Sequence, residues 1–164
     1  MAHIASRFQT IGAVCESSRW LANRLCGAMT SGATEDIVEL GAGFGSVTRV
    51  LPEHAVSIER DPKRFGYLKQ RFPSRSILDC CAVDFIASLE RPAIVISSIP
   101  NVNNPEFGRL RNAVAQSRDR GNIIELITYT YFPHNPFDGI FSIEERKWLE
   151  FLNVPPAFVW RYTC

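Results

Sequence analysis

The chain has 164 residues, of which 46% are hydrophobic and 21% are charged, with a formal net charge of +1. This length fits one domain with a sizeable buried core. The near-neutral charge argues against a broad nucleic-acid interface, for which a basic stripe is expected.

The cysteines and histidines give no sign of a metal or disulfide framework. The five cysteines form no C-x-x-C pair, and the three histidines lack metal-ligand spacing, so we expect reduced thiols and no metal site. No apolar run approaches the roughly 20 residues needed to cross a bilayer, and a secretory signal is missing. The sequence therefore predicts a soluble, cytoplasmic protein.

Residues 1–30 are expected to form an N-terminal cap or lid. Ser17 or Ser18 can cap a helix whose apolar residues repeat at helical spacing. These apolar residues are Trp20, Leu21, Leu25, Ala28 and Met29. Two interpretations stay open: the helix simply covers the sheet, or it helps to close a ligand site.

A glycine-rich turn follows the first predicted strand, residues 36–40, which is rich in apolar and β-branched residues. Gly41, Gly43 and Gly45 alternate, and without Cβ atoms they let the backbone turn sharply and approach a ligand. Ser46 stands where the dinucleotide fingerprint requires its third glycine. Glu39 precedes the first glycine by two residues and would repel a phosphate, so it suits a ligand that carries positive charge.

The second predicted strand, residues 55–59, ends in Glu59, where an acid can accept hydrogen bonds from ribose hydroxyls. A ligand with a ribose, a positive charge and no phosphate matches S-adenosylmethionine. The two segments resemble the first two motifs of the class I methyltransferases, E-x-G-x-G-x-G and an acid that closes the second strand. A glycine turn in another kind of α/β protein is the alternative.

The remaining elements alternate between helices and strands. We expect helices at about 45–51, from Asp61-Pro62 to 72, and after Asn104. We expect further strands at 76–80, 93–97 and 122–128, and a terminal hairpin from strands at 145–152 and 157–162. This pattern predicts one α/β domain over residues 1–164: a doubly wound, mostly parallel Rossmann-like sheet with a C-terminal antiparallel hairpin.

Ligands of doubly wound sheets bind at the carboxyl ends of the strands. The methyltransferase resemblance implies that the glycine loop faces the methionine part of the cofactor and Glu59 the ribose. The segment after the third strand would hold the adenine, with Cys81 in place of the usual acid. Either Asp79 or Asp84 then reaches the adenine amine, or other groups bind it. The predicted cofactor-binding residues are Gly12, Glu39, Gly41, Ala42, Gly43, Glu59, Arg60, Cys81, Ala82 and Ser97.

The loop after the fourth strand is expected to lie beneath the transferred methyl group. Asn101 follows Pro100 there, at the position where methyltransferases acting on adenine or cytosine carry a stacking aromatic residue. Its absence argues against a nucleobase acceptor. Ser98, Tyr129 and His134 are the predicted catalytic residues, which would orient or deprotonate an amine; packing roles for the two ring residues are the alternative.

Motifs across the chain resemble a narrower family, the bacterial phospholipid N-methyltransferases. Residues 10–25 are similar to its G-A-[IV]-x-P-S-S-R-x-L-A segment, with Glu16 in place of the proline. Residues 153–162, NVPPAFVWRY, closely match its terminal N-x-P-P-A-x-V-[WY]-R-Y. Residues 58–62 and 128–129 match shorter motifs.

The resemblance implies methylation of the phosphatidylethanolamine amine at the inner membrane face. Residues 1–9 contain few basic side chains, and positive and negative charges are balanced over the chain. Both features predict only weak electrostatic attraction to the surface of anionic membranes. A small amine, or a lipid presented by a partner, is therefore an open alternative. Two further alternatives are an adenine N-methyltransferase acting on rRNA or another nucleic acid, and a cofactor-binding relative with other chemistry or none.

Overall fold

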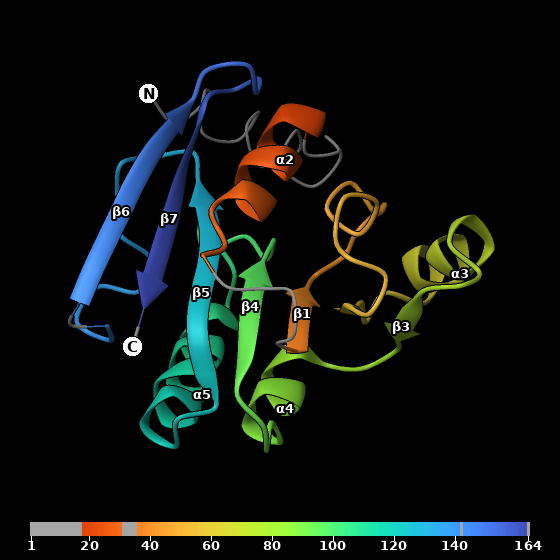
Figure 1. The fold of residues 1–164 in the computed structure, drawn as a ribbon, viewed down its shortest axis with the longest axis horizontal. Coiled ribbons are helices and arrows are strands. Elements are labelled where there is room, and N and C mark those ends of the chain that lie inside the picture. Colours follow the sequence, from red (N-terminus) through yellow and green to blue (C-terminus); the bar gives the residue numbers. More distant parts are fainter. Residues whose placement is uncertain (1–17, 31–35, 142, 164) are drawn as a thin grey trace.

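A computed structural model describes residues 18–30, 36–141 and 143–163, and the side chains of 143–147 also lie outside the description. Within these residues the chain forms a seven-stranded sheet in the order β3-β2-β1-β4-β5-β7-β6 (Figure 1). The strands are β1 (Asp36–Leu40), β2 (Val56–Ile58), β3 (Ser76–Leu78), β4 (Ala93–Ser97), β5 (Ile123–Thr130), β6 (Ile143–Glu150) and β7 (Ala157–Thr163). The helices are α2 (Arg19–Gly27), α3 (Pro62–Arg71), α4 (Ala82–Ala87) and α5 (Phe107–Asp119).

The central strands are buried on both faces, as expected for parallel strands covered by helices. Every residue of β4 is buried, and its side chains alternate between two apolar clusters. Ala93 and Val95 join the cluster that contains α4 and α5, whereas Ile94 and Ile96 join the cluster that contains α2. The predicted doubly wound sheet is therefore confirmed.

Two predicted helix starts are also confirmed. The Ser18 hydroxyl caps α2 by accepting from the Leu21 N–H at 3.2 Å. The Asp61 carboxylate caps α3 by accepting from two backbone N–H groups at 3.0 Å, and the Arg64 N–H is the main cause that lowers the pKa of Asp61.

The helix predicted over residues 45–51 is wrong. Gly45 has φ of +85°, outside the helical region, and Pro52 soon follows, so the intervening residues form only turns. The opposite error occurs at α4, a six-residue helix that no periodic pattern revealed because the segment is so short. The predicted strand 122–128 extends to Thr130, which places Tyr129 inside β5.

The terminal hairpin is confirmed, and it completes the sheet in antiparallel fashion. β7 pairs antiparallel with β5 and with β6. β6 therefore runs in the same direction as the parallel strands, and its turn into β7 lies at the edge where those strands have their carboxyl ends (Figure 1). We call this edge the carboxyl edge.

Candidate functional site

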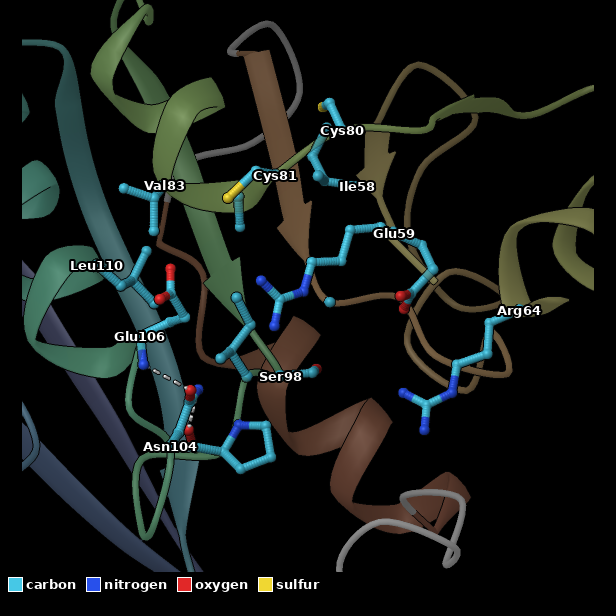
Figure 2. A pocket seen from close by; sticks show the side chains of 15 residues that line it. Ile58, Glu59, Arg64, Cys80, Cys81, Val83, Ser98, Asn104, Glu106 and Leu110 are labelled. Atoms are coloured by element: carbon cyan, nitrogen blue, oxygen red, sulfur yellow. Dashed lines mark hydrogen bonds between the residues drawn. The ribbon is translucent and has the colours of Figure 1, made fainter. Parts of the chain in front are cut away.

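A pocket opens at the carboxyl edge, between β1 and β4, where the strand order of the sheet reverses (Figure 2). Such a switch point is where doubly wound sheets bind their ligands. Six residues singled out from the sequence line it: Gly41, Glu59, Arg60, Cys81, Ala82 and Ser98. Ala42, Gly43, Glu39 and Ser97 lie close by in the chain but outside the lining, and Gly12 lies outside the described residues.

The three glycines of the loop are needed for different reasons, although all have positive φ. A Cβ on Gly41 would lie 2.9 Å from Cγ1 of Ile99, and one on Gly45 would lie 2.3 Å from the Phe72 ring. Both positions are therefore fixed by packing within the protein. A Cβ on Gly43 would meet nothing nearer than the Gly41 carbonyl at 3.9 Å, so the space before Gly43 is open to a ligand.

Glu59 is only 5% exposed, and its carboxylate is held by the backbone. Oε2 accepts from the Gly43 N–H at 2.8 Å, and Oε1 accepts from the Asp61 N–H at 2.9 Å. Each carboxylate oxygen can accept a second hydrogen bond. Two adjacent oxygens, each with one remaining acceptor site, match the two neighbouring hydroxyls of a ribose.

Glu39 is fully buried beside the glycine loop instead of lining the pocket. Its Oε2 accepts from the hydroxyls of Thr48 and Ser57, both at 2.6 Å, whereas its Oε1 has no hydrogen-bond partner among the described residues. Burial raises the pKa of Glu39 above its ordinary value. The side chain thus joins β1, β2 and the segment after the loop, and its contact with a positively charged ligand stays a prediction.

The segment from β3 into α4 forms another wall of the pocket. Cys80, Cys81, Ala82 and Val83 line it, and Cys81 occupies the N-cap of α4 without a side-chain cap bond. Burial raises the pKa of the Cys80 thiol, with the neighbouring Cys81 contributing. The acids considered as substitutes for Cys81, at positions 79 and 84, are not part of the lining.

Ser98 lies at the end of β4 and faces the pocket (Figure 2). Its N–H donates to the Leu40 carbonyl at 2.9 Å, which ties β4 to the start of the glycine loop. Its buried Oγ has no hydrogen-bond partner among the described residues. A buried hydroxyl without a partner costs free energy, and the contact of Ser98 with a ligand stays a prediction.

The two predicted ring residues do not line the pocket. Tyr129 packs with the apolar cluster on the α2 face, and its ring lies 5.6 Å from that of Tyr131. His134 is exposed in the segment that follows β5. The pocket instead opens on the side of the sheet covered by α4 and α5, since Val83 and Leu110 line it.

Sequence reasoning missed several lining residues on helices and at the start of one. Arg64 on α3, Asn104 and Glu106 before α5, and Leu110 on α5 all line the pocket. Asn104 had a visible signal, because an Asn-Pro-Glu run predicts a helix start; its Oδ1 does accept from the Glu106 N–H at 3.0 Å. The orientation of Arg64 and Leu110 toward the pocket depends on tertiary packing and leaves no local pattern.

The described residues contain neither a membrane-spanning helix nor a cluster of metal ligands. No helix in the described ranges is long and apolar enough to span a bilayer. Likewise, the described part of the chain contains no group of three or more His, Cys, Asp or Glu side chains placed to hold a metal ion.

Comparison with known proteins finds a sequence relative and several structures with the same fold. No protein-family model matches the chain. A curated relative, the ornithine lipid N-methyltransferase of Singulisphaera acidiphila, is 26% identical over 168 residues, spanning 90% of this chain and 85% of its own.

Several solved structures share the fold. The 23S rRNA methyltransferase ErmE superposes with a TM-score of 0.65 at 15% identity, covering 89% of this chain and 68% of ErmE. An RNA methyltransferase from Salinibacter ruber, solved with S-adenosyl-L-homocysteine, gives 0.59 at 13% identity, with 90% and 92% coverage. The chain therefore has the Rossmann-like fold of the class I methyltransferases.

Proposed function

We propose that this protein transfers a methyl group from S-adenosylmethionine to the amine nitrogen of a lipid head group. Its cofactor is S-adenosylmethionine, which the fold and the relatives imply. The observation that carries the cofactor assignment is the Glu59 carboxylate, whose two oxygens each keep one acceptor site beside the open face of Gly43.

The lipid acceptor is supported by two independent observations. The curated relative is an ornithine lipid N-methyltransferase and aligns over most of both chains. The loop that follows β4 carries Pro100-Asn101 and so lacks an aromatic residue to stack on a nucleobase. A primary amine, as in phosphatidylethanolamine or an ornithine lipid, needs no such stacking. Peripheral contact with the inner face of the membrane belongs to the same proposal.

The chain's own residues would act mainly by alignment. Glu59 holds the ribose hydroxyls, and the apolar wall of Ile58, Ala82 and Leu110 encloses the adenine side. When bound, S-adenosylmethionine supplies an electrophilic methyl group. Fixing an amine in line with that group can contribute about 7–11 kcal/mol to lowering the barrier.

Ser98 is the best-placed residue for orienting the acceptor. Its Oγ is buried at the pocket wall and can accept a hydrogen bond from the amine N–H. The amine attacks only in its neutral form. Partial removal from water beside the apolar wall favours that form, because desolvation disfavours an ammonium ion.

Labelled methyl transfer tests the proposal. The purified protein is incubated with methyl-labelled S-adenosylmethionine and, separately, with a bacterial lipid extract, total RNA, ethanolamine and ornithine. We expect label in the lipid fraction, and its loss in a Glu59→Ala variant that remains folded. Label found only in RNA would favour the nucleic-acid alternative, and label only in the free amines would favour a small acceptor.

A further inference from the structure

Three large apolar side chains project into solvent from the turn between β6 and β7. Phe151 is 72% exposed, Leu152 is 60% exposed and Val154 is 81% exposed. We call these three residues the hairpin tip. Single exposed apolar residues are ordinary on protein surfaces, but a contiguous group marks a binding surface.

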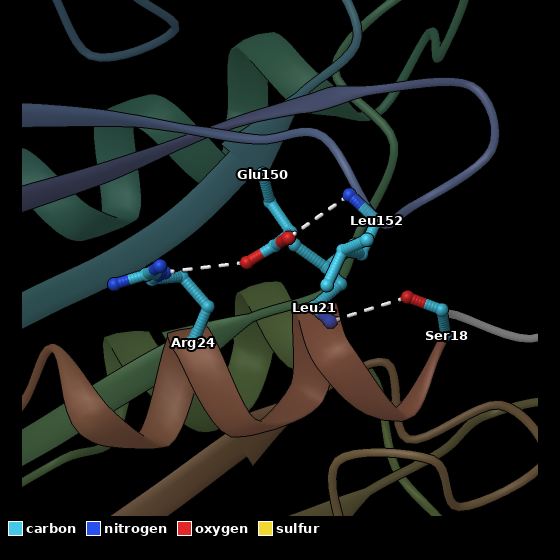
Figure 3. Close-up of polar contacts among 5 residues, drawn as sticks. All are labelled: Ser18, Leu21, Arg24, Glu150 and Leu152. Atoms are coloured by element: carbon cyan, nitrogen blue, oxygen red, sulfur yellow. Dashed lines mark hydrogen bonds and ion pairs between the residues drawn. The ribbon is translucent and has the colours of Figure 1, made fainter.

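The polar residues of the turn hold the hairpin tip in place (Figure 3). Glu150 is 7% exposed; one oxygen accepts from the Leu152 N–H at 3.0 Å, and the other accepts from Arg24 on α2 at 3.3 Å. Asn153 is buried, and its Oδ1 accepts from the Ser18 N–H at 3.2 Å. The turn thus buries its polar groups against α2 and presents its apolar ones outward.

The hairpin tip lies at the carboxyl edge, the edge that also holds the candidate pocket (Figure 1). The loops that follow β4 and β5 add Val102, 50% exposed, and Phe132, 54% exposed, at this edge. In the described loops of the opposite edge, no large apolar side chain is exposed to this degree. The apolar surface is therefore concentrated where a substrate would enter.

The first residues of α2 give this surface the character of a membrane interface. Arg19 and Trp20 follow Ser18, which contacts the turn, and the Arg19 guanidinium lies 4.6 Å from the centre of the Trp20 ring. Trp20 is 43% exposed. Tryptophan and arginine are favoured at the level of lipid head groups, where one contacts the acyl boundary and the other the phosphate.

The size of the hairpin tip favours a bilayer over a protein partner. A stable protein interface engages roughly 20–30 residues on each side. A turn with three outward apolar side chains offers far less than that. It is sufficient for shallow insertion at the boundary between head groups and acyl chains, where binding grows with the apolar area buried.

We propose that the hairpin tip inserts into the surface of a phospholipid bilayer and so brings the carboxyl-edge pocket to the lipid head groups. This inference deepens the proposed function, which already includes peripheral membrane contact, by naming the surface that makes the contact. The insertion itself is argued from the exposed side chains and is tested without any methyl transfer. Insertion of apolar side chains requires little electrostatic attraction, which agrees with the net charge of +1. Binding should therefore depend only weakly on salt.

Vesicle co-sedimentation tests the inference with three proteins: the wild type, the triple variant Phe151→Ser/Leu152→Ser/Val154→Ser, and the control Leu78→Ser. Leu78, 41% exposed, is the last residue of β3 and so lies on the carboxyl edge too, but at the opposite end of the strand order from the hairpin; it controls for the loss of an exposed apolar side chain elsewhere on this edge. With phosphatidylethanolamine/phosphatidylcholine vesicles we expect the triple variant to lose about tenfold or more in partition coefficient. The control should match the wild type, and doubling the salt should change wild-type binding less than twofold.

Two results would overturn the inference: wild-type protein that stays in the supernatant, or a triple variant that binds as well as the wild type. Tryptophan fluorescence of a Phe151→Trp variant reports on the tip directly. Brominated lipids should quench the fluorescence of this variant more strongly than that of a Leu78→Trp variant. Equal quenching of the two variants would contradict insertion.

Activity separates this inference from the proposed function. The triple variant should methylate a detergent-dispersed short-chain phosphatidylethanolamine as the wild type does, but lose methylation of the same head group in vesicles. If no lipid is methylated by any variant while the vesicles still bind through the tip, the proposed function fails and the membrane contact stands.

Discussion

Gly43 provides the sharpest test of where the cofactor lies, because no side chain of the protein packs against it. In Gly43→Ala, the new Cβ would contact only the Gly41 carbonyl at 3.9 Å, which is an ordinary van der Waals distance. The φ of +60° remains unfavourable for an L-residue and should cost about 1–2 kcal/mol of stability. The protein should therefore fold, with its new methyl group in the space assigned to the cofactor.

Gly121→Ala is the matched control for this change. Gly121 has φ of +76° and also has open space around it, but it lies after α5 at the opposite edge of the sheet. Both variants should lose similar free energy of unfolding in urea. By calorimetry with S-adenosylhomocysteine, Gly43→Ala should lose at least about tenfold in affinity, and Gly43→Val should not bind. Equal affinities for Gly43→Ala and Gly121→Ala would refute the placement.

Three other changes test the site. Glu59→Gln keeps the shape of the side chain but removes its charge, and should weaken cofactor binding by roughly 1.5–3 kcal/mol in the same calorimetric assay; undiminished affinity would remove Glu59 from the ribose. Ser98→Ala should retain cofactor affinity and lower kcat, whereas an unchanged kcat would show that its hydroxyl does not orient the amine. Glu39 has a raised pKa, so the folded state binds its proton more tightly and the free energy of unfolding should fall as pH rises from about 4.5 through that pKa. Glu39→Gln should remove this fall in urea titrations at pH 4.5, 6 and 8, and an unaltered pH slope would contradict it.

The sheet and the ends of its strands could be predicted because their signals are local. Alternating and continuous apolar runs identified the strands, and Asp61 before Pro62 marked the start of α3. The spacing between the glycine loop and Glu59 matched that of a βαβ nucleotide-binding unit and so marked this acid as a candidate for the ribose. Each of these features depends on a few neighbouring residues, which is the information that a sequence pattern contains.

The division of roles among nearby residues could not be predicted, because it depends on contacts between distant segments. Gly41 and Gly45 are glycines because Ile99 and Phe72 pack against them, from 58 and 27 residues away along the chain. Tyr129 packs with the cluster on the α2 face, a direction that depends on the length of β5 and the packing of α2 and has no local signal; its place beside the acceptor stays a prediction. The outward direction of the hairpin tip depends on the contact between the turn and Ser18, which lies far away along the chain.

The most direct test of the central proposal is mass spectrometry of defined vesicles after incubation with the protein and S-adenosylmethionine. Separate vesicles contain phosphatidylethanolamine, ornithine lipid, or phosphatidylglycerol, which has no amine. We predict that one or more methyl groups are added to an amine-bearing head group, that phosphatidylglycerol is unchanged, and that folded Glu59→Ala adds none. Unmodified amine lipids, from a protein that binds the cofactor and methylates RNA instead, would contradict the proposal.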